Sequence, residues 1–513
     1  MKEGLSPRRT QDGVYLVLID GRWRPSVSGG IHDSVNPASI ETHLGKVPEC
    51  TREEVAEATR AAARDFDAWR LIPGDFRTKF LYRLAELLKE NEAPLVEAMT
   101  REMGKSLFDS RLDWLEAVGV CEAIAPQGAN VKGVTYPKIL KGLAMESRLA
   151  PRGPAAIITP FNFPIAIPLA QIAAALATGN TVVWKPSHLV PESSQALAAL
   201  VLSALESEAA GQSVQVPPGI FSMVLGDETT GDALVRAPEI FTLSFTGSKP
   251  VGDKVDSIAS GLGKRVMKEV GGINTFYVHE KADLDRAAWN FLYGKTITSG
   301  QRCSSIQEAL VDEAVHDAFL ERALRLAAGV VHGPGASPEI AAAHASRDRF
   351  ACPPLAGEEQ LERVRRIVKA SVAAGARVRF ESRVAPELAR SGHYHPFMIV
   401  TDVPKGSALD REEVFGPVGV VTRVKDIHEA IRITNEKVGI VTCIDSRDKS
   451  ATENYIERVL RTRIDDGRHG TGALWGTKFG GDRGAGSGNP ALDEDMVLGY
   501  TIWKTIYRAY EPL

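Results

Sequence analysis

The 513-residue sequence has little cysteine. Its five thiols are scattered, with no Cys-x-x-Cys pair: Cys50, Cys121, Cys303, Cys352 and Cys443. So few thiols exclude a disulfide framework, and the missing pair excludes a zinc ribbon or a dithiol redox motif. His393 and His395 have no third ligand at a suitable spacing, so no metal site is expected. A reducing, cytoplasmic compartment fits this composition best.

The sequence also lacks an excess of charge of one sign. It has 61 basic and 65 acidic residues, a formal net charge of −4, which gives no basic field for nucleic acid. Residues 1–13 carry charges and no apolar stretch, so no secretory signal is expected. Residues 153–184 are uncharged, but Pro160, Pro164 and Pro168 would break a lipid-exposed helix, so we expect no membrane span.

The standard phosphate-binding motifs are missing too. Gly104-Lys105-Ser106 lacks the first glycine of a P-loop and lies at a predicted helix end. Gly484-x-Gly486-x-Gly488 follows no predicted strand, so a flexible turn is favoured over a dinucleotide fingerprint.

What the sequence does contain is typical of a globular α/β protein. Apolar residues make up 44% and charged residues 25%, and the length suits about two to four domains. Residues 51–70 predict a helix with a threonine cap and an acidic first turn, and residues 76–103 continue with amphipathic helices. Two short apolar runs, 155–159 and 181–184, flank residues 165–178, which are apolar all round. This pattern predicts a β-α-β unit of a parallel sheet.

The alternation continues through most of the chain. Further strands are predicted at 220–225, 240–245, 265–270, 276–279, 308–311, 398–403 and 418–424. Further helices are predicted at 229–236, 249–259, 284–299, 314–328 and 427–435. Residues 497–507 predict a β-rich tail, and 332–357 and 465–490 long irregular loops. We expect two α/β units in tandem, with a ligand cleft at their seam near Gly271-Gly272.

Four local patterns are candidates for chemistry. Residues 245–252 (FTGSKPVG) follow a predicted strand and open a helix, which suits either a bound phosphate or an ordinary joint. Cys303 has Gly300 nearby for backbone freedom and Arg302 to favour a thiolate, although most lone cysteines are packing residues. Glu269 precedes a double glycine and is either a general base or a solvated charge. Asn162, between two phenylalanines, either donates to an oxyanion or forms a turn.

Taken together, these motifs resemble the aldehyde dehydrogenase superfamily. They run in the family's order: PFNFP (160–164), KPS (185–187), FTGSxxxG (245–252), EVGG (269–272), GQRC (300–303), EEVFGPV (412–418) and FGG (479–481). Each motif is weak alone, but seven in order are specific. The resemblance extends from Val35-Asn36-Pro37 to the last strand. It implies an α/β fold with a Rossmann-like cofactor-binding domain (1–130 and 151–271), a catalytic α/β domain (272–470) and a small β oligomerisation element (131–150 and 485–513).

The resemblance also implies roles for residues. Cys303 corresponds to the nucleophile that forms a thiohemiacetal, and the Asn162 side chain with the Cys303 N–H to the oxyanion hole. Hydride then passes to the nicotinamide, and Glu269 activates the water that hydrolyses the thioester. NAD or NADP would contact Ile158, Thr159, Pro160, Phe161, Lys185, Ser187, His188, Gly247, Ser248, Gly252, Glu413 and Phe415. The aldehyde would be lined by Phe161, Arg302, Ser304, Ser305, Trp475 and Phe479.

Two positions depart from the family pattern. His188 stands where many NAD-preferring members have a glutamate for the ribose 2′-hydroxyl, so NADP remains open. Gln171 stands where some members have a lysine, which leaves a proton relay there in doubt.

Residues 471–476 (TGALWG) faintly resemble the segment with which glutamate-semialdehyde dehydrogenases hold the amino-acid end of their substrate. A carboxylate-bearing semialdehyde, bound by Ser305 and backbone N–H groups there, is therefore one expectation. The alternatives are a CoA-acylating dehydrogenase, opposed by Glu269, and a non-catalytic relative, opposed by intact Cys303, Glu269 and Asn162. A metal-binding protein is the weakest alternative. A homodimer or homotetramer, with no nucleic-acid or membrane partner, follows only from the resemblance.

Overall fold

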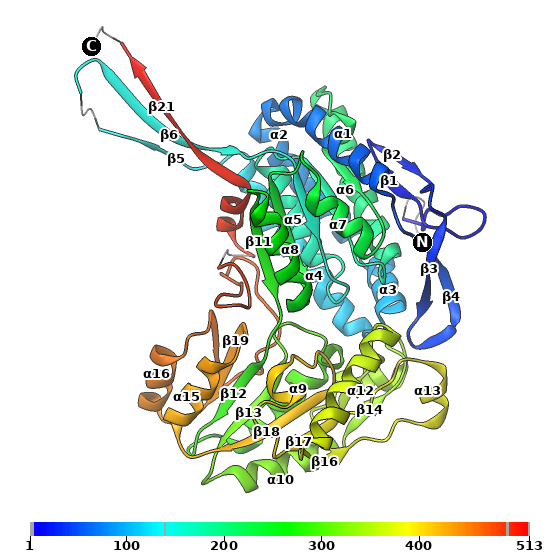
Figure 1. Cartoon of the computed structure of the whole chain (residues 1–513), viewed down its shortest axis with the longest axis vertical. Helices are drawn as coiled ribbons and strands as arrows, with labels where there is room; N and C mark the ends of the chain where they lie inside the picture. Colours follow the sequence, from blue (N-terminus) through cyan, green and yellow to red (C-terminus); the bar gives the residue numbers. More distant parts are fainter. Residues whose placement is uncertain (1–4, 138–139, 489–491, 511–513) are drawn as a thin grey trace.

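The computed structural model describes residues 5–137, 140–488 and 492–510. Figure 1 shows two lobes, each built around one sheet, and an arm that leaves the upper lobe. The sheet of the upper lobe has the order β11-β10-β7-β8-β9-β1-β2. Its strands are β1 (Val17–Ile19), β2 (Arg22–Arg24), β7 (Ala155–Ile158), β8 (Val182–Lys185), β9 (Phe221–Met223), β10 (Thr242–Gly247) and β11 (Arg265–Val270).

Helices cover this first sheet. They are α1 (Arg52–Leu71), α2 (Gly74–Glu90), α3 (Glu92–Met103), α4 (Leu107–Ile124), α5 (Ala166–Ala177), α6 (Pro191–Gln212), α7 (Glu228–Arg236) and α8 (Lys249–Gly261). Helix α1 begins with the predicted cap, since Thr51 and Glu54 form a reciprocal capping box. Nearly all of α5 is buried, which explains its apolar sequence, and β7-α5-β8 is the predicted parallel unit. Strands β7 to β11 are parallel, and β1 and β2 add an antiparallel edge.

The second sheet fills the lower lobe in the order β16-β17-β18-β13-β12-β19-β20. Its strands are β12 (Asn274–Val278), β13 (Ile306–Asp312), β16 (Arg377–Glu381), β17 (Met398–Thr401), β18 (Val418–Val424), β19 (Val441–Asp445) and β20 (Arg463–Asp466). Its helices are α9 (Leu284–Thr296), α10 (His316–Ala327), α11 (Pro338–His344), α12 (Glu358–Ala373), α13 (Pro386–Ser391), α14 (Ala408–Arg411), α15 (Ile427–Glu436) and α16 (Lys449–Arg458). Only β16 is antiparallel to its neighbour.

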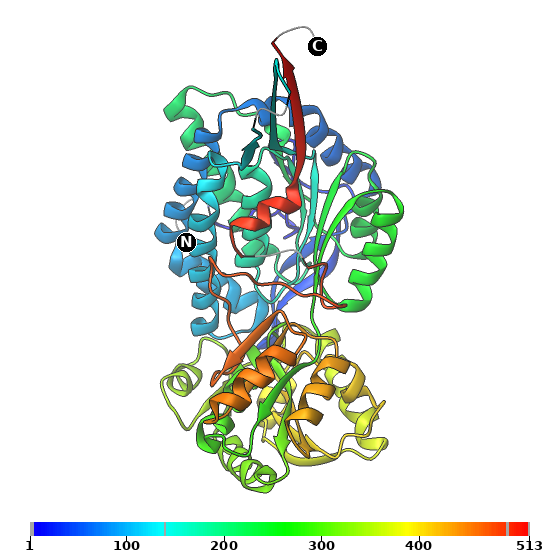
Figure 2. The same cartoon turned by 90° about the vertical axis from the view of Figure 1, so that its left-hand side faces the viewer.

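Three smaller sheets complete the fold. The arm is an antiparallel sheet of β5 (Gly133–Thr135), β6 (Leu143–Pro151) and β21 (Thr501–Ala509), and it projects from the upper lobe in both views (Figures 1 and 2). β3 (Gly30–Asn36) pairs with β4 (Ser39–Pro48), and β14 (Val330–His332) with β15 (Phe350–Cys352). Short 3-10 turns lie at η1 (Ala125–Gly128), η2 (Pro218–Ile220), η3 (Ile297–Gly300) and η4 (Glu494–Tyr500). Parts of the predicted oligomerisation ranges, 138–139, 489–491 and 511–513, lie outside the described residues.

Some predicted boundaries are wrong. The helix predicted at 284–299 ends at Thr296, because the next residues turn into η3 with Thr298 and Ser299 in left-handed backbone. The tail forms a strand only from Thr501, since the residues before it form η4. The loop predicted at 332–357 contains helix α11 and strand β15. In the described part of the chain, no helix is long and apolar enough to cross a membrane.

The order of the first sheet places its ligand-binding edge. Strand β7 lies between β10 and β8, so successive connections run in opposite directions from it. In open parallel sheets, ligands bind beyond the carboxyl ends of the strands at such a switch point. The carboxyl ends of β7 and β10 are Ile158 and Gly247, and both lead towards the second lobe.

Candidate active site

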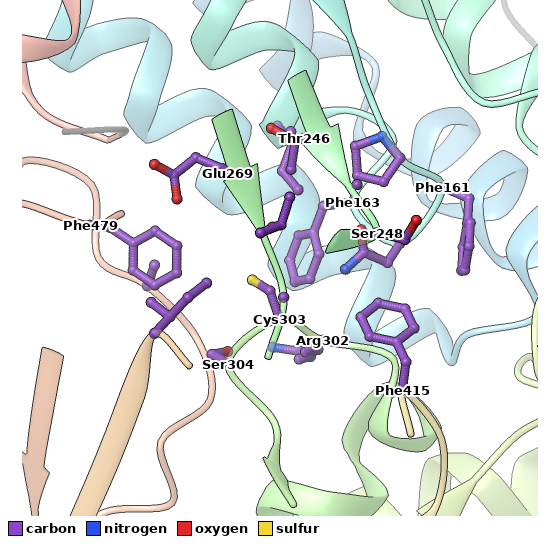
Figure 3. A pocket seen from close by; sticks show the side chains of 18 of the residues that line it. Phe161, Phe163, Thr246, Ser248, Glu269, Arg302, Cys303, Ser304, Phe415 and Phe479 are labelled. Atoms are coloured by element: carbon purple, nitrogen blue, oxygen red, sulfur yellow. The ribbon is translucent and has the colours of Figure 1, made fainter. Parts of the chain in front are cut away.

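A pocket opens at this switch point, between the two lobes. Its lining comes from both, and includes Asn162 after β7, Gly247 at the end of β10, Glu269 on β11, Cys303 after η3 and Glu413 before β18. Figure 3 shows the Cys303 sulfur in the middle, with Phe161 and Phe415 on one side and Phe479 and Ser304 on the other. The predicted seam at Gly271 belongs to the same lining. The cleft is therefore where the sequence predicted it.

The loop that carries Cys303 is held in an unusual backbone conformation. Thr298, Ser299 and Gly300 all have φ between 52° and 73°. Side chains at two of these positions disfavour that region, so the surroundings must hold it. The Asp109 carboxylate accepts the Thr298 N–H at 3.0 Å, and the Ser299 hydroxyl donates to the Pro353 carbonyl at 2.5 Å. Three consecutive left-handed residues turn the chain so that Cys303 reaches the pocket.

The Cys303 thiol is strongly desolvated. Burial, together with the carboxylates of Glu413, Glu269 and Glu116, raises its pKa to about 12, against a smaller lowering by Arg302. The sequence suggested that Arg302 would favour the thiolate, but burial outweighs it. Arg302 also forms an ion pair with Asp109, at 3.2 Å, and this pairing weakens its stabilisation of a Cys303 thiolate. The cysteine thus needs a base before it can attack.

Asn162 lies beside the Cys303 loop. Its Nδ2 donates to the Gln301 carbonyl at 3.1 Å, and its Oδ1 is buried without a partner. Because an amide nitrogen carries two hydrogens, the second N–H remains available for an oxyanion in the pocket. The Asn162 carbonyl is held from behind by the buried ammonium of Lys105, at 3.1 Å. Asn162 thus has a backbone held in place and one side-chain N–H available to donate to an oxyanion.

Glu269 lies on β11, and its Oε2 accepts the Gly481 N–H at 2.6 Å. Its Oε1 is buried without a partner. Burial raises the pKa of Glu269 well above the usual carboxyl value, and the Gly481 bond offsets only part of this. Figure 3 shows the carboxylate turned towards the Phe479 segment rather than towards the sulfur. The group therefore has the basicity of a general base, but must rotate to serve Cys303.

The Phe161 and Phe415 side of the pocket offers groups suited to a dinucleotide. Helix α8 begins there at Ser248, whose side chain does not cap it, so first-turn N–H groups are left to bind an anion. The buried Lys185 ammonium donates to the carbonyls of Gly226 and Pro186, at 2.7 and 3.1 Å, and has one hydrogen left. Glu413 lies so close to the seam that a Cβ at Gly271 would come within 2.1 Å of its Oε2. Free N–H groups at the start of α8 and the Glu413 carboxylate in the lining, with the Lys185 ammonium outside it, are chemically suited to NAD or NADP.

His188 lies near Lys185, beyond the end of β8. Its Nδ1 is 3.7 Å from Asp227 Oδ1, and its ring stacks on His32, with centroids 5.1 Å apart. His32 in turn faces Glu49, at 3.4 Å. The position that carries a glutamate in many NAD-preferring members thus has two imidazoles with a carboxylate beside each.

Not every predicted residue lies in the pocket. The lining includes Pro160, Phe161, Gly247, Ser248, Arg302, Ser304, Glu413, Phe415 and Phe479. Ser305 does not, because its hydroxyl turns inwards to the Gly294 carbonyl at 2.9 Å. Trp475 packs on Gly119 of α4, outside the lining.

The remaining predicted residues surround the pocket without lining it. The buried Ile158 and Thr159 support the loop from below, with the Thr159 hydroxyl accepting the Trp184 N–H at 2.9 Å. Ser187 caps its own turn by accepting the Leu189 N–H. Gly252 packs against Val270, where a Cβ would come within 2.6 Å.

The structure adds residues that the sequence did not single out. Gln360 and Arg363 on α12 line the pocket and bond the carbonyls of Phe415 and Glu413, at 2.6 and 2.7 Å. Glu116 on α4 also lines it. Helix α4 lies far before Cys303 in the sequence, so no local sequence pattern indicates that Glu116 reaches the pocket. Gln171 lies in the lining too, and its Oε1 accepts the hydroxyls of Ser244 and Tyr500 at 2.5 and 2.8 Å, as a packing partner.

No metal centre is evident in the part of the chain that the structure describes: no three His, Cys, Asp or Glu side chains form a suitable group. His395 instead faces the Pro396 carbonyl, at 2.7 Å.

A parallel sheet whose switch point opens onto this cleft has the architecture of a nucleotide-binding α/β protein. Residues 23–506 match the model of the aldehyde dehydrogenase family, and the chain belongs to that family. It therefore oxidises an aldehyde to the acid with NAD or NADP. The predicted fold class, enzyme class and cofactors are confirmed.

Three similar proteins illustrate the match. The α-ketoglutaric semialdehyde dehydrogenase of Bacillus subtilis (strain 168) is 26% identical over 501 residues, which cover 97% of this chain and 99% of that one. The non-phosphorylating aspartate-semialdehyde dehydrogenase of Halomonas elongata is 32% identical over 433 residues, covering 84% and 83%. The crystal structure of an NADP-dependent enzyme of E. coli superposes with a TM-score of 0.88 at 28% identity, covering 98% of both chains.

Proposed function

We propose that this enzyme oxidises a semialdehyde whose far end carries a carboxylate, with Cys303 as nucleophile, Asn162 as oxyanion donor and Glu269 as general base. The observation that carries the proposal is that one pocket brings these three side chains together from both lobes. Both curated relatives described above are named semialdehyde dehydrogenases, which supports the substrate class. Ser304, Gly472, Ala473 and Phe479 belong to the same lining, and in this proposal they face the substrate's far end.

The chain's own groups perform the covalent steps. The Cys303 thiol passes its proton to the rotated Glu269 carboxylate, which releases it to solvent, and Sγ attacks the aldehyde carbon to form a thiohemiacetal. The alkoxide that develops is held by the spare N–H of Asn162 and the Cys303 backbone N–H, which are fixed before reaction. When bound, the nicotinamide ring supplies the hydride acceptor that turns this adduct into a thioester. Glu269, rotated away from Gly481, takes a proton from the water that releases the acid and frees Cys303.

The cofactor is held by residues of both lobes in this proposal. The first turn of α8, at Ser248, binds the pyrophosphate, and Lys185 binds the adenosine ribose. Glu413 binds the nicotinamide ribose. Burial raises the pKa of Glu413 to about 7, and Arg363, the Gly272 N–H and Lys295 oppose that rise, so a hydroxyl donor would further favour its charged form.

The assembly and the domains follow the same proposal. The sheet of β7 to β11 forms the cofactor-binding domain, the second sheet forms the catalytic domain, and the arm is the oligomerisation element. On the arm, Ile502, Trp503 and Tyr507 are 49%, 51% and 65% exposed, which supports burial against a second copy. We propose a cytoplasmic homodimer or homotetramer that acts on a small aldehyde without nucleic-acid or membrane partners.

Formation of reduced nicotinamide by the purified protein tests the proposal. NAD and NADP are run in parallel with aliphatic, aromatic and carboxylate-bearing aldehydes, and Cys303→Ala is the control. We expect turnover that is greatest with a semialdehyde, absent in Cys303→Ala, and unchanged by added CoA. Equal turnover of propanal and the semialdehyde would contradict the substrate class, and a rate that depends on CoA would contradict hydrolysis.

A further inference from the structure

One face of helix α4 carries three carboxylates towards the interior. Asp109, Asp113 and Glu116 follow one another at spacings of four and three residues, which places them on the same side of the helix. Asp109 and Asp113 are buried, and Glu116 lines the substrate pocket. Asp109 and Asp113 are fully buried and Glu116 is half-buried, so an unpaired charge on this acidic stripe of the helix is costly.

Two of the three carboxylates have a cation from the chain itself. Lys105 Nζ lies 2.7 Å from Asp113 Oδ2, and Arg302 lies 3.2 Å from Asp109 Oδ1. The other nearby cation, Arg463 on β20, is paired with Asp465 at 2.8 Å. Within residues 5–137, 140–488 and 492–510, Glu116 has neither an ion pair nor a hydrogen bond. The chain therefore supplies a partner to every acid of this stripe except the one that faces the pocket.

Glu116 lies at the end of the pocket that would hold the substrate. One turn further along α4, Gly119 packs against Trp475, next to Gly472 and Ala473 of the pocket wall. The Glu116 charge is also close enough to raise the pKa of Cys303. Phe163, Ile167 and Leu492 add apolar surface to the same lining. A ligand bound at Cys303 would thus pass an apolar wall and reach one free carboxylate.

We infer that the aldehyde taken by this pocket carries a protonated amine, which pairs with the Glu116 carboxylate. The inference rests on the proposed function, because the ligand is the substrate of that site, and it adds a second charged group to the proposed semialdehyde. An ammonium supplies the positive charge that the interior stripe lacks at this position. A neutral or purely anionic aldehyde leaves Glu116 without a counter-ion and favours its protonated form, whereas an ammonium favours the carboxylate.

The first experiment compares two isosteric aldehydes. 3-Aminopropanal and butanal differ only in an ammonium in place of a methyl group, so the ratio of their kcat/KM values isolates the charge. We expect the ratio to fall by about tenfold or more in Glu116→Gln, the size of a lost hydrogen bond to a charged group. Because Glu116 also raises the pKa of Cys303, its loss affects the turnover of both aldehydes, and the ratio between them is the readout. Glu122→Gln, a surface carboxylate on the same helix, is the matched control and should keep the wild-type ratio.

The pH dependence gives a signature that a structural role would not. Burial and Asp113 raise the pKa of Glu116 to about 8, while Arg302, Lys105 and Arg463 lower it. These groups face Glu116 from α4, from the loop before α4, from the Cys303 loop and from β20. The ion pair needs the deprotonated carboxyl, so the 3-aminopropanal to butanal ratio should rise from pH 6 to pH 8. In Glu116→Gln this ratio should not change with pH.

A second measurement does not require turnover. Alkylation of Cys303 by iodoacetamide is followed with n-propylammonium or neutral 1-propanol present. We expect propylammonium to slow alkylation more than propanol in the wild type, and equally little in Glu116→Gln. Turnover of butanal with an unchanged amine ratio in Glu116→Gln would overturn the inference alone. If no aldehyde is turned over, the proposed function fails, and equal protection by the two probes would then overturn the inference as well.

Discussion

Lys105 holds the catalytic loop from behind, and its removal should affect stability and turnover separately. Its Nζ donates to Asp113 Oδ2 at 2.7 Å and to the Asn162 carbonyl at 3.1 Å. The two charged side chains are 1% and 0% exposed. Lys105→Met keeps most of the side-chain volume and removes the charge. Asp113 would then keep the Ala166 N–H, at 2.8 Å, as its donor, with no cation paired to it.

The structure sets the expected size of the effect. Breaking a buried ion pair on one side costs about 3–5 kcal/mol, because the remaining charge stays buried. An unfolding entropy of about 2.1 cal/mol/K per residue gives about 1 °C per kcal/mol for a chain of 513 residues, so the melting temperature should fall by about 3–5 °C. The Asn162 carbonyl also loses its anchor. Since loss of an oxyanion donor lowers kcat by about 10²–10³, a displaced Asn162 should lower it by about 10–100-fold.

The double variant Lys105→Met/Asp113→Asn separates these effects. It removes the orphaned charge, so at least half of the lost melting temperature should return, measured by circular dichroism without cofactor. Its kcat should stay low, because nothing holds the Asn162 carbonyl. Lys89→Met, which breaks an exposed pair with Glu122, is the control and should change little. A double variant no more stable than the single one, or a wild-type kcat in either, would refute this reasoning.

Three further outcomes are expected. Asn162→Ala should lower kcat by about 10²–10³ with unchanged circular dichroism, and a loss below tenfold would argue against an oxyanion donor. Because Glu269 has a pKa well above 4.5 and must be ionised to act as a base, kcat should fall as pH drops through that raised pKa. Glu269→Gln should lose this limb and accumulate an acyl-enzyme visible by mass spectrometry, whereas unchanged hydrolysis would exclude the role. His188→Glu should weaken binding of 2′,5′-ADP more than of 5′-AMP in a calorimetric titration, since a carboxylate repels the 2′-phosphate; equal weakening would show that His188 does not face it.

The sequence predicted much of the fold because the signals for it are local. The all-apolar stretch at 165–178 is a buried helix, since both faces of α5 are covered. Thr51 and Glu54 form their cap within four residues, so no tertiary contact is needed to recognise it. The seam near Gly271-Gly272 was visible as the junction of two alternating α/β regions, whereas the close contact of Gly271 with Glu413 is known only from the structure.

What the sequence did not predict depends on contacts between distant segments. Ser304 and Ser305 are neighbours with the same chemistry, yet the chain direction after η3 sends one into the pocket and the other to Gly294. The pairing of Lys105 with Asp113 and the exposure of Glu116 to the pocket depend on the rotation of α4 against the Cys303 loop. The amphipathic pattern of a helix predicts which of its sides is buried. It does not predict that Asp113 pairs with a cation while Glu116 lines a pocket.

The hydrogen bonds at Gln171 have a consequence for the C-terminal arm. A single amide oxygen on α5 accepts hydroxyls from β10 and from Tyr500, one residue before β21 begins. Helix α5 follows directly on the loop that carries Asn162, so the root of the arm and the oxyanion loop share one buried support. The arm therefore cannot be treated as a detachable appendage. A chain truncated before Tyr500 would leave a cavity beneath the active-site loop, and this sets a limit on how far the C-terminus can be shortened or redesigned.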